Sequence, residues 1–190
     1  LTWTNAANVP SVGMHNVYFD VHNANDFNPA DNKDTLTFMV SDSAYSYMDT
    51  LTDGASFGIG DGADGILGSV FDIPTTSNIS SVSFYSPAPD PTAMVSFVIY
   101  EVGAGGPTSV KVFESDTFST TGTSPTMYNR PVNISLNGGS KYLIGVREQL
   151  TGSMRIGSNP NGYFPDSHYA FFQGAWMEVG GAGFPLSVSI

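Results

Sequence analysis

Hydrophobic and small polar residues alternate along most of this chain. The spacing is two residues, whereas a helix would place its hydrophobic residues three and four apart. Runs of this kind lie at residues 82–84, 95–99, 110–112, 132–136 and 142–146. Each run predicts a β-strand whose alternate side chains form one inward face.

Turn-forming residues separate these runs. They include Pro and Asp at 87–91, Gly and Pro at 103–107, Asn-Gly-Gly at 137–139 and Asn-Pro-Asn-Gly at 159–162. Glycine, asparagine and proline favour the backbone conformations of tight turns. Short strands joined by such turns are typical of an antiparallel β-sandwich or barrel. The sequence therefore predicts an all-β protein.

The first third of the chain has a different pattern. Residues 17–21 and 36–40 predict two strands, joined by a polar segment rich in Asn and Asp. Such a hairpin is suited to the edge of an immunoglobulin-like sheet. We therefore expect residues 1–41 to be strands from the end of an immunoglobulin-like module. Residues 42–65 would form a Gly- and Asp-rich connection, and residues 66–190 the main β-sandwich.

A glycine-rich acidic loop precedes the strand predicted at residues 66–73. Four glycines among residues 58–65 let the backbone turn freely, and Asp61 and Asp64 could face one point. Calcium prefers such oxygen ligands. The loop predicts a structural calcium site at Asp61 and Asp64, with a plain solvated turn as the alternative interpretation. A second acidic set carries suitable groups and also lacks the EF-hand spacing; its members are Asp26, Asn28, Asp31 and Asp34.

The charge of the chain excludes several partners. The formal net charge is −11, and residues 1–72 hold ten Asp against Lys33 alone. Such a negative field repels nucleic acid and anionic membrane surfaces and attracts cations. An alternative interpretation is that these aspartates simply occupy turns and maintain solubility. No stretch approaches the roughly 20 apolar residues of a membrane span, so we expect no membrane insertion.

The residues that catalysis requires are not arranged for it in the sequence. The chain has no cysteine, which excludes disulfides, thiolate catalysis and cysteine-ligated metals. Its histidines, His15, His22 and His168, lack the HExxH spacing of zinc proteases, and no G-x-S-x-G motif occurs. Glu148 and Glu178 are a conceivable pair of glycosidase carboxylates, although two unrelated surface acids explain them as well. We expect no enzymatic activity.

Aromatic residues near the C-terminus provide the candidate ligand site. Sugar rings stack on flat aromatic faces while neighbouring polar groups bind their hydroxyls. The predicted ligand-binding residues are Tyr163, Tyr169, Trp176 and Arg155, with Asp166 and Gln173 nearby in sequence. The alternative is that these rings fill the core, which the spacing of Tyr169 and Phe171 favours for one face.

The order of several short motifs resembles extracellular domains of Bacteroidetes surface and secreted proteins exported by the type IX (Por) secretion system. These motifs lie at residues 40–45, 58–62, 67–71, 79–85, 98–102, 143–146, 154–157, 174–176 and 183–186. The resemblance spans residues 35–190. It implies a jelly-roll-like β-sandwich that serves as an accessory or adhesion module, and it implies no catalysis in this segment. Three triplets, at residues 34–36, 42–44 and 49–51, are similar to O-glycosylation acceptors of that phylum.

These observations together predict a non-catalytic extracellular module of a larger surface or secreted protein, serving adhesion or substrate targeting. A carbohydrate-binding module attached to a secreted hydrolase is the first alternative, and a structural spacer or assembly component is the second. The expected partners are a glycan or surface protein and other domains of the same polypeptide. Residue 1 is Leu and no charged-then-apolar leader follows it, so we expect a mature product or an excised piece.

Overall fold

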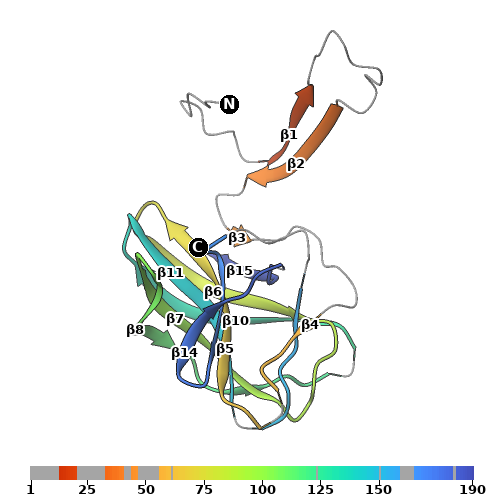
Figure 1. The fold of residues 1–190 in the computed structure, drawn as a ribbon, viewed down its shortest axis with the longest axis vertical. Helices are drawn as coiled ribbons and strands as arrows, with labels where there is room; N and C mark the ends of the chain where they lie inside the picture. Colours follow the sequence, from red (N-terminus) through yellow and green to blue (C-terminus); the bar gives the residue numbers. More distant parts are fainter. Residues whose placement is uncertain are drawn as a thin grey trace. The chain divides into compact units, whose positions relative to one another are not determined.

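The computed structural model describes residues 13–20, 33–40, 44–46, 56–60, 62–122, 124–149, 151–158, 165–181 and 183–190. The chain divides into two compact units, Leu1–Ser43 and Ala44–Ile190. Every regular element in the described ranges is a β-strand (Figure 1). Within these ranges no helix is long and apolar enough to cross a membrane.

The first unit contains one antiparallel hairpin. β1 (Gly13–Asp20) pairs with β2 (Lys33–Val40) along the whole length of both strands. Both strands were predicted from the sequence. Met14 and Tyr18 of β1 leave 63% and 74% of their surface exposed, so the described part of this hairpin buries little apolar area of its own.

The second unit is built from thirteen described strands. A seven-stranded sheet has the order β14-β13-β5-β11-β7-β8, with β9 also paired to β7, and a four-stranded sheet has the order β10-β6-β15-β3. β12 and β4 form a separate two-stranded pair. The strands are β3 (Ala44–Ser46), β4 (Ser56–Phe57), β5 (Gly65–Ile73), β6 (Ser77–Ser86), β7 (Met94–Gly103), β8 (Gly106–Glu114), β9 (Phe118–Ser119), β10 (Thr126–Leu136), β11 (Ser140–Glu148), β12 (Ile156–Gly157), β13 (His168–Phe172), β14 (Ala175–Glu178) and β15 (Leu186–Ser189).

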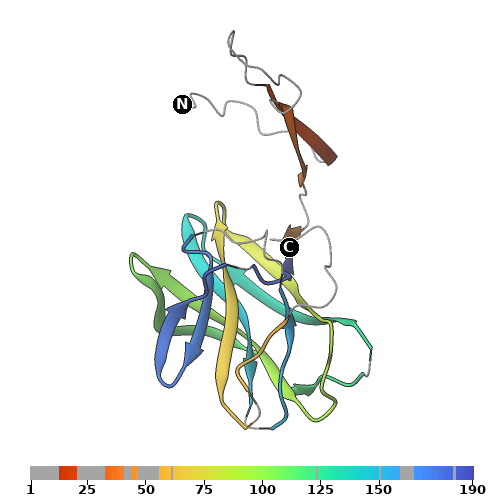
Figure 2. The same ribbon diagram turned by 45° about the vertical axis from the view of Figure 1, so that its right-hand side comes forward.

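The pairings in both sheets are antiparallel, and neighbours in each sheet are often distant in sequence. C-terminal β15 lies between β6 and β3, and β13 lies against β5. Figure 2 shows the sheets facing each other as the two layers of a sandwich. The prediction of an all-β antiparallel, jelly-roll-like sandwich is confirmed.

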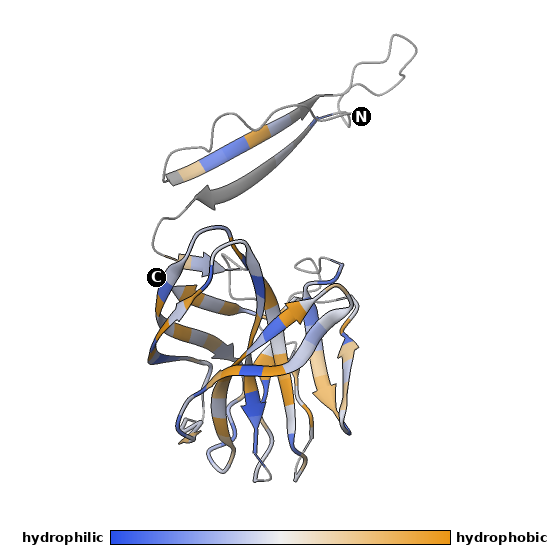
Figure 3. Cartoon of the chain, turned by 90° about the vertical axis from the view of Figure 1, so that its left-hand side faces the viewer, coloured by the Kyte–Doolittle hydropathy of each residue, from blue (hydrophilic) through white to orange (hydrophobic). Residues whose placement is uncertain are grey.

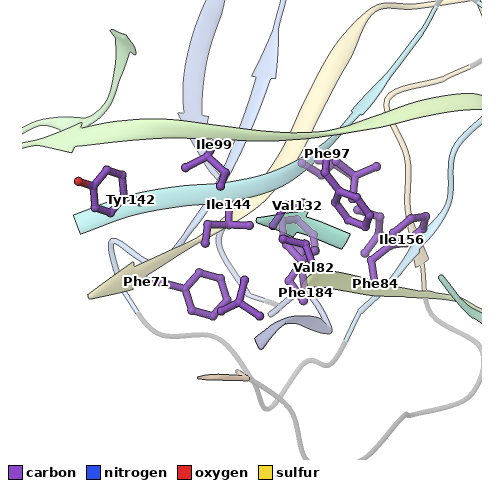
Figure 4. Close-up of a cluster of buried hydrophobic side chains, with 14 of the residues drawn as sticks. Phe71, Val82, Phe84, Phe97, Ile99, Val132, Tyr142, Ile144, Ile156 and Phe184 are labelled. Atoms are coloured by element: carbon purple, nitrogen blue, oxygen red, sulfur yellow. The ribbon is translucent and has the colours of Figure 1, made fainter. Parts of the chain in front are cut away.

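The main core lies between the two sheets. Phe84 of β6 stacks on Tyr128 of β10, with ring centroids 5.0 Å apart, and meets Phe97 of β7 edge-on at 5.8 Å. Figure 4 shows these β6 and β7 rings beside the aliphatic side chains of Ile144 and Ile156. The alternating runs at residues 82–84, 95–99 and 142–146 supply the buried side chains, as their spacing predicts.

Two details differ from the predicted pattern. Val110 was expected on an inward face but is 50% exposed, whereas Val112 packs against the core. The pairing of β8 with β7 shifts register twice, and such irregularities change which side chains face the core. In addition, β3 and β4 form within the segment expected to be a connection, where they pair with β15 and β12.

Candidate functional site

The seven-stranded sheet has a second apolar cluster on the face that points away from the main core. We call this cluster the outer cluster; its buried members are Ile66, Val70, Val98, Leu143 and Tyr169. β5 therefore buries side chains on both of its faces. Figure 3 shows hydrophobic residues along the strands of this sheet. A sheet face can bury such a cluster without a second sheet only if the sheet curls over it.

Contacts across the outer face show this curl. The rings of Tyr100 on β7 and Trp176 on β14 lie 5.4 Å apart edge-on, although β13, β5 and β11 separate their strands. Trp176 also packs against Phe171 of β13, at 5.1 Å. The outer face is therefore concave, and it brings together residues from opposite sides of the sheet.

Two glycines form the floor of the concave face. Gly68 of β5 lies directly opposite Gly145 of β11, and Tyr169 of β13 lies opposite Gly68. A Cβ at Gly145 would lie 2.7 Å from the Leu67 carbonyl oxygen, and one at Gly68 would lie 2.8 Å from a Leu143 methyl group. A side chain at Gly145 would therefore collide with the backbone of β5, whereas one at Gly68 would have to displace the Leu143 side chain.

A pocket opens at one end of the concave face. We call it the Tyr169 pocket; its volume is about 590 Å³, within the range of small-molecule sites. Residues of three turns and of five strands, β5, β7, β8, β11 and β13, line it. The lining residues are Val70, Val102, Gly103, Ala104, Gly105, Gly106, Gly139, Ser140, Lys141, Asp166 and Tyr169.

Tyr169 is the aromatic residue of this pocket. Its side chain is only 8% exposed, and the turn between β7 and β8 closes on it. A Cβ at Gly106 would lie 3.2 Å from the Tyr169 hydroxyl oxygen, and Gly106 has φ of +107°. Only glycine adopts this conformation readily at so close an approach. In the described part of the chain the hydroxyl has no hydrogen-bond partner, although it borders the pocket.

Carboxylates lie on one side of Tyr169. Glu178 of β14 is directly opposite Tyr169 in register, and its Oε1 accepts a 2.8 Å hydrogen bond from the backbone N–H of Asp166. Burial, followed by the negative charges of Asp166 and Glu178, raises the pKa of the Tyr169 hydroxyl. The phenol therefore stays protonated at neutral pH and can donate or accept a hydrogen bond.

The opposite wall of the pocket carries a cation. Lys141 and Ser140 begin β11, and Asp72 of β5 lies directly opposite Lys141 in register. Because Phe71 packs in the main core, strand alternation places Asp72 on the same outer face as Lys141. The pocket thus combines an aromatic hydroxyl, a carboxylate, an ammonium and a serine hydroxyl around a glycine-lined opening.

An ion-pair network occupies the other end of the concave face. Arg147 of β11 donates from Nε and Nη2 to the two carboxylate oxygens of Asp64, at 2.9 and 2.6 Å, and from Nη1 to Glu114 at 3.2 Å. Glu114 also pairs with Lys111 and accepts from the Ser96 hydroxyl. The hydrogen bonds from Arg147 are the chief cause that lowers the pKa of Asp64.

The predicted calcium loop lies beside this network. Asp64 uses both carboxylate oxygens on Arg147, and Asp61 lies outside the described residues, as do Asp26, Asn28 and Asp31 of the alternative set. Among described residues, no group of three or more acidic or histidine side chains could hold a metal ion. The loop folds over buried Glu148, whose Oε2 accepts a hydrogen bond from the Ile59 backbone at 3.3 Å. Calcium at Asp61 and Asp64 stays a prediction.

The structure places two of the predicted ligand-binding residues, Tyr169 and Trp176, at the same outer cluster. Tyr169 lines the pocket, whereas Trp176 contributes to the aromatic contacts of the concave face and is not among the lining residues. Arg155 is exposed near Asp90, whose pKa is lowered chiefly by hydrogen bonds from Thr92 and least by the charge of Arg155. It therefore belongs to a different part of the sandwich. Tyr163 lies outside the described residues. The spacing of Tyr169 and Phe171 indicated that both side chains share one face of a strand, and they do. That face carries the outer cluster and does not face the main core between the sheets.

The structure also places the two glutamates weighed for catalysis and a buried serine–histidine pair that the sequence did not point to. Glu148 and Glu178 lie on opposite faces of the seven-stranded sheet. Glu148 follows Arg147 on β11, so strand alternation turns it away from the outer face on which Arg147 lies. Glu178 is paired with Tyr169 in register and shares the outer face with it. Ser69 Oγ lies 2.9 Å from His168 Nδ1, but both side chains are fully buried in the sandwich interior. A buried hydrogen bond of this kind stabilises a core and gives a substrate no access.

Comparisons with known proteins give a likeness of fold. No protein-family model matches the sequence, and no curated protein matches it. The structure is similar to a clostridial cysteine protease, Cwp84, after propeptide cleavage, with a TM-score of 0.61 and 13% identity over 81% of this chain. It is also similar to a structure of the cysteine protease and lectin-like domains of Cwp84, a surface layer associated protein of Clostridium difficile, with a TM-score of 0.58 and 14% identity over 81% of this chain.

The matched regions span 41% and 37% of those two solved chains. At such low identity the similarity concerns the arrangement of strands and not the residues of a site. The β-sandwich is therefore shared with part of a bacterial surface protein.

Proposed function

We propose that this chain is a non-catalytic extracellular module of a larger cell-surface or secreted protein, and that it binds a glycan in the Tyr169 pocket. The observation that carries the proposal is the pocket itself. It joins one buried aromatic residue, Tyr169, to hydrogen-bonding side chains of β11 and of the turn before β13. Glycan sites combine an aromatic surface with polar groups in this way.

Two further observations support a surface role. The resemblance to domains exported by the type IX secretion system implies an extracellular accessory or adhesion module. The similar solved structure belongs to a surface-layer protein and includes a lectin-like domain. The net charge of −11 is also unfavourable for nucleic-acid partners. Adhesion or substrate targeting would then follow from holding a glycan beside the other domains of the polypeptide.

The pocket can be blocked without disturbing the fold. Gly105 lines the pocket, and a Cβ built on it has no heavy atom within 4 Å. The same is true of Gly180, which is outside the pocket, and neither residue has a positive φ. Gly105→Leu would therefore add a bulky side chain at the rim of the pocket without a steric clash, and Gly180→Leu is a matched control.

A glycan array with the wild type and both variants tests the proposal. We expect selective binding by the wild type and the Gly180→Leu variant, and loss of at least about tenfold in affinity for Gly105→Leu, which corresponds to about 1.4 kcal/mol. Running the array with calcium and then with a chelator tests whether an ion contributes. Equal binding by all three proteins would remove the pocket from the proposal, and no binding at all would favour a structural spacer.

A further inference from the structure

We propose that the glycan residue seated in the Tyr169 pocket is an amino sugar with a free, protonated amine. This inference rests on the proposed function, because it names the chemical class of the ligand at the same site. The ammonium would lie between the Tyr169 hydroxyl and the Asp166 carboxylate. The hydroxyls of the sugar would face Ser140 and Lys141.

The first observation is an unused hydrogen-bonding group. Tyr169 is 92% buried, since only 8% of its surface is exposed, and its hydroxyl has no hydrogen-bond partner in the described part of the chain. Because this hydroxyl is accessible from the pocket, water can satisfy it in the free protein and a ligand can replace that water. The hydroxyl borders the pocket, so a ligand atom there can supply the missing partner.

The second observation is the sign of the charge around that hydroxyl. Asp166 lines the pocket, and Glu178 lies directly opposite Tyr169 on β14. Burial raises the pKa of the Tyr169 hydroxyl most, and the negative charges of Asp166 and Glu178 raise it further. Negative charge disfavours an acidic sugar such as a uronate and stabilises an ammonium, which forms stronger, charge-assisted hydrogen bonds with carboxylates.

The single cation of the pocket lies away from this side. Lys141 begins β11 and Asp166 precedes β13, and β5 runs between these two strands. Neighbouring strands are about 4.8 Å apart, so the two walls are separated by roughly 10 Å. Asp72 lies directly opposite Lys141 in register on β5. An amine can therefore bind at the Asp166 wall without meeting the ammonium of Lys141.

The position of Asp166 is fixed by the fold. Its backbone N–H donates to Glu178 Oε1 at 2.8 Å, and its φ is +59°. Asn and Asp are the side chains that tolerate this left-handed conformation best. Asp166→Asn therefore removes the charge while keeping the size and backbone preference of the residue.

The experiment compares three oligosaccharides of equal length by calorimetric titration of the whole chain at low ionic strength. The probes are the tetrasaccharides of glucosamine, N-acetylglucosamine and glucose, with a lysine-containing tripeptide as an amine without a sugar. We expect the glucosamine oligomer to bind about tenfold or more tightly than the other two sugars. We also expect this preference to weaken as salt is added.

Three variants assign the preference to the pocket. Asp166→Asn and Tyr169→Phe should each reduce glucosamine affinity about tenfold, and neither should lower the thermal midpoint, because Tyr169→Phe removes a hydroxyl without a partner. Asp116→Asn removes the same charge from an exposed loop that lines a different pocket. It should bind like the wild type.

The outcomes separate this inference from the proposed function. Equal affinity for all three sugars, lost in Gly105→Leu, would overturn the amino-sugar inference and leave the glycan site standing. Equal loss in Asp166→Asn and Asp116→Asn would show attraction to the acidic surface only and would also overturn it. Binding of no sugar, or of the lysine peptide alone, would overturn both.

Discussion

Single residues in this sandwich show how polar groups are buried at low cost. Ser69 and His168 are both fully buried, and they satisfy each other across β5 and β13 at 2.9 Å. The His168 ring also meets Phe184 edge-on at 5.5 Å. Satisfied polar pairs in a core are inexpensive, but removing one partner leaves the other with the full cost of desolvation.

Ser69→Ala should therefore destabilise the fold by about 1–3 kcal/mol, because His168 Nδ1 loses this hydrogen bond inside the core. Urea unfolding of the wild type and variant measures the difference. Ser109→Ala, at an exposed position of β8, is the control and should change stability by less than about 0.5 kcal/mol. A neutral Ser69→Ala would mean that the buried pair contributes nothing to stability.

Asp64 connects a single residue to the pH dependence of the whole fold. Arg147 lowers its folded-state pKa, so the pair stabilises the protein above the ordinary Asp pKa of about 3.9 and loses that effect as pH falls through the folded value. Because the Asp64 side chain is 43% exposed, we expect at most about 1 kcal/mol from the pair.

Asp64→Asn should accordingly lower the thermal midpoint at neutral pH, and the gap from the wild type should close as the pH is taken below about 4. A series of thermal melts from neutral to acidic pH measures this gap. A gap that stays constant over the whole range would show that the loss is not due to ionisation of Asp64.

At the scale of elements, the close approach of β5 and β11 determines the shape of the concave face. Gly145 is opposite both Gly68 and Val98, so it forms the centre of three adjacent strands. A side chain here would meet the backbone of β5, which cannot move away as the end of a flexible side chain would. The curl that forms the pocket therefore depends on glycine in the interior of a strand.

Gly145→Ala should destabilise the domain by about 1–3 kcal/mol through overpacking. Gly180→Ala, where the added Cβ meets no heavy atom within 4 Å, should be nearly neutral. Thermal and urea unfolding of both variants give the comparison. Equal stability of the two would show that the glycine floor is not a constraint on the sheet.

Much of the element pattern could be predicted from the sequence, because each strand of the main core carries its own period of two. The site was harder to predict. β5 and β11 bury side chains on both faces, so alternation could place Tyr169 and Phe171 on one face without identifying which. The curl of the sheet brings distant parts of the chain to the pocket, namely Ser140, Lys141 and the Gly103–Gly106 turn. No local sequence pattern predicts this curl. For Asp166, the sequence indicated only that a polar residue lies close to the aromatic residues along the chain.

At the scale of the whole molecule, the described residues of the two units form very different structures. The described strands of the first unit pair only with each other, and isolated two-stranded hairpins are marginal in water. The second unit contains both sheets, both apolar clusters and the Tyr169 pocket. The second unit therefore holds the proposed binding site, and we expect it to fold on its own.

Residues 44–190 alone should fold cooperatively, with a thermal midpoint within a few degrees of the full chain. The physical reason is that the contacts that bury apolar area in the described structure lie within this unit. Calorimetry of the two proteins gives the test. A fragment that melts far below the full chain would show that the first 43 residues support the sandwich.

The measurement that tests the central claim most directly is an NMR titration of the tyrosine-labelled protein with the best oligosaccharide from the array. The account predicts that the ring signals of Tyr169 shift in a saturable way. Those of Tyr128, which is equally buried but stacks on Phe84 in the main core, should stay in place. Binding that leaves the Tyr169 signals unmoved would contradict the assignment of this pocket as the glycan site.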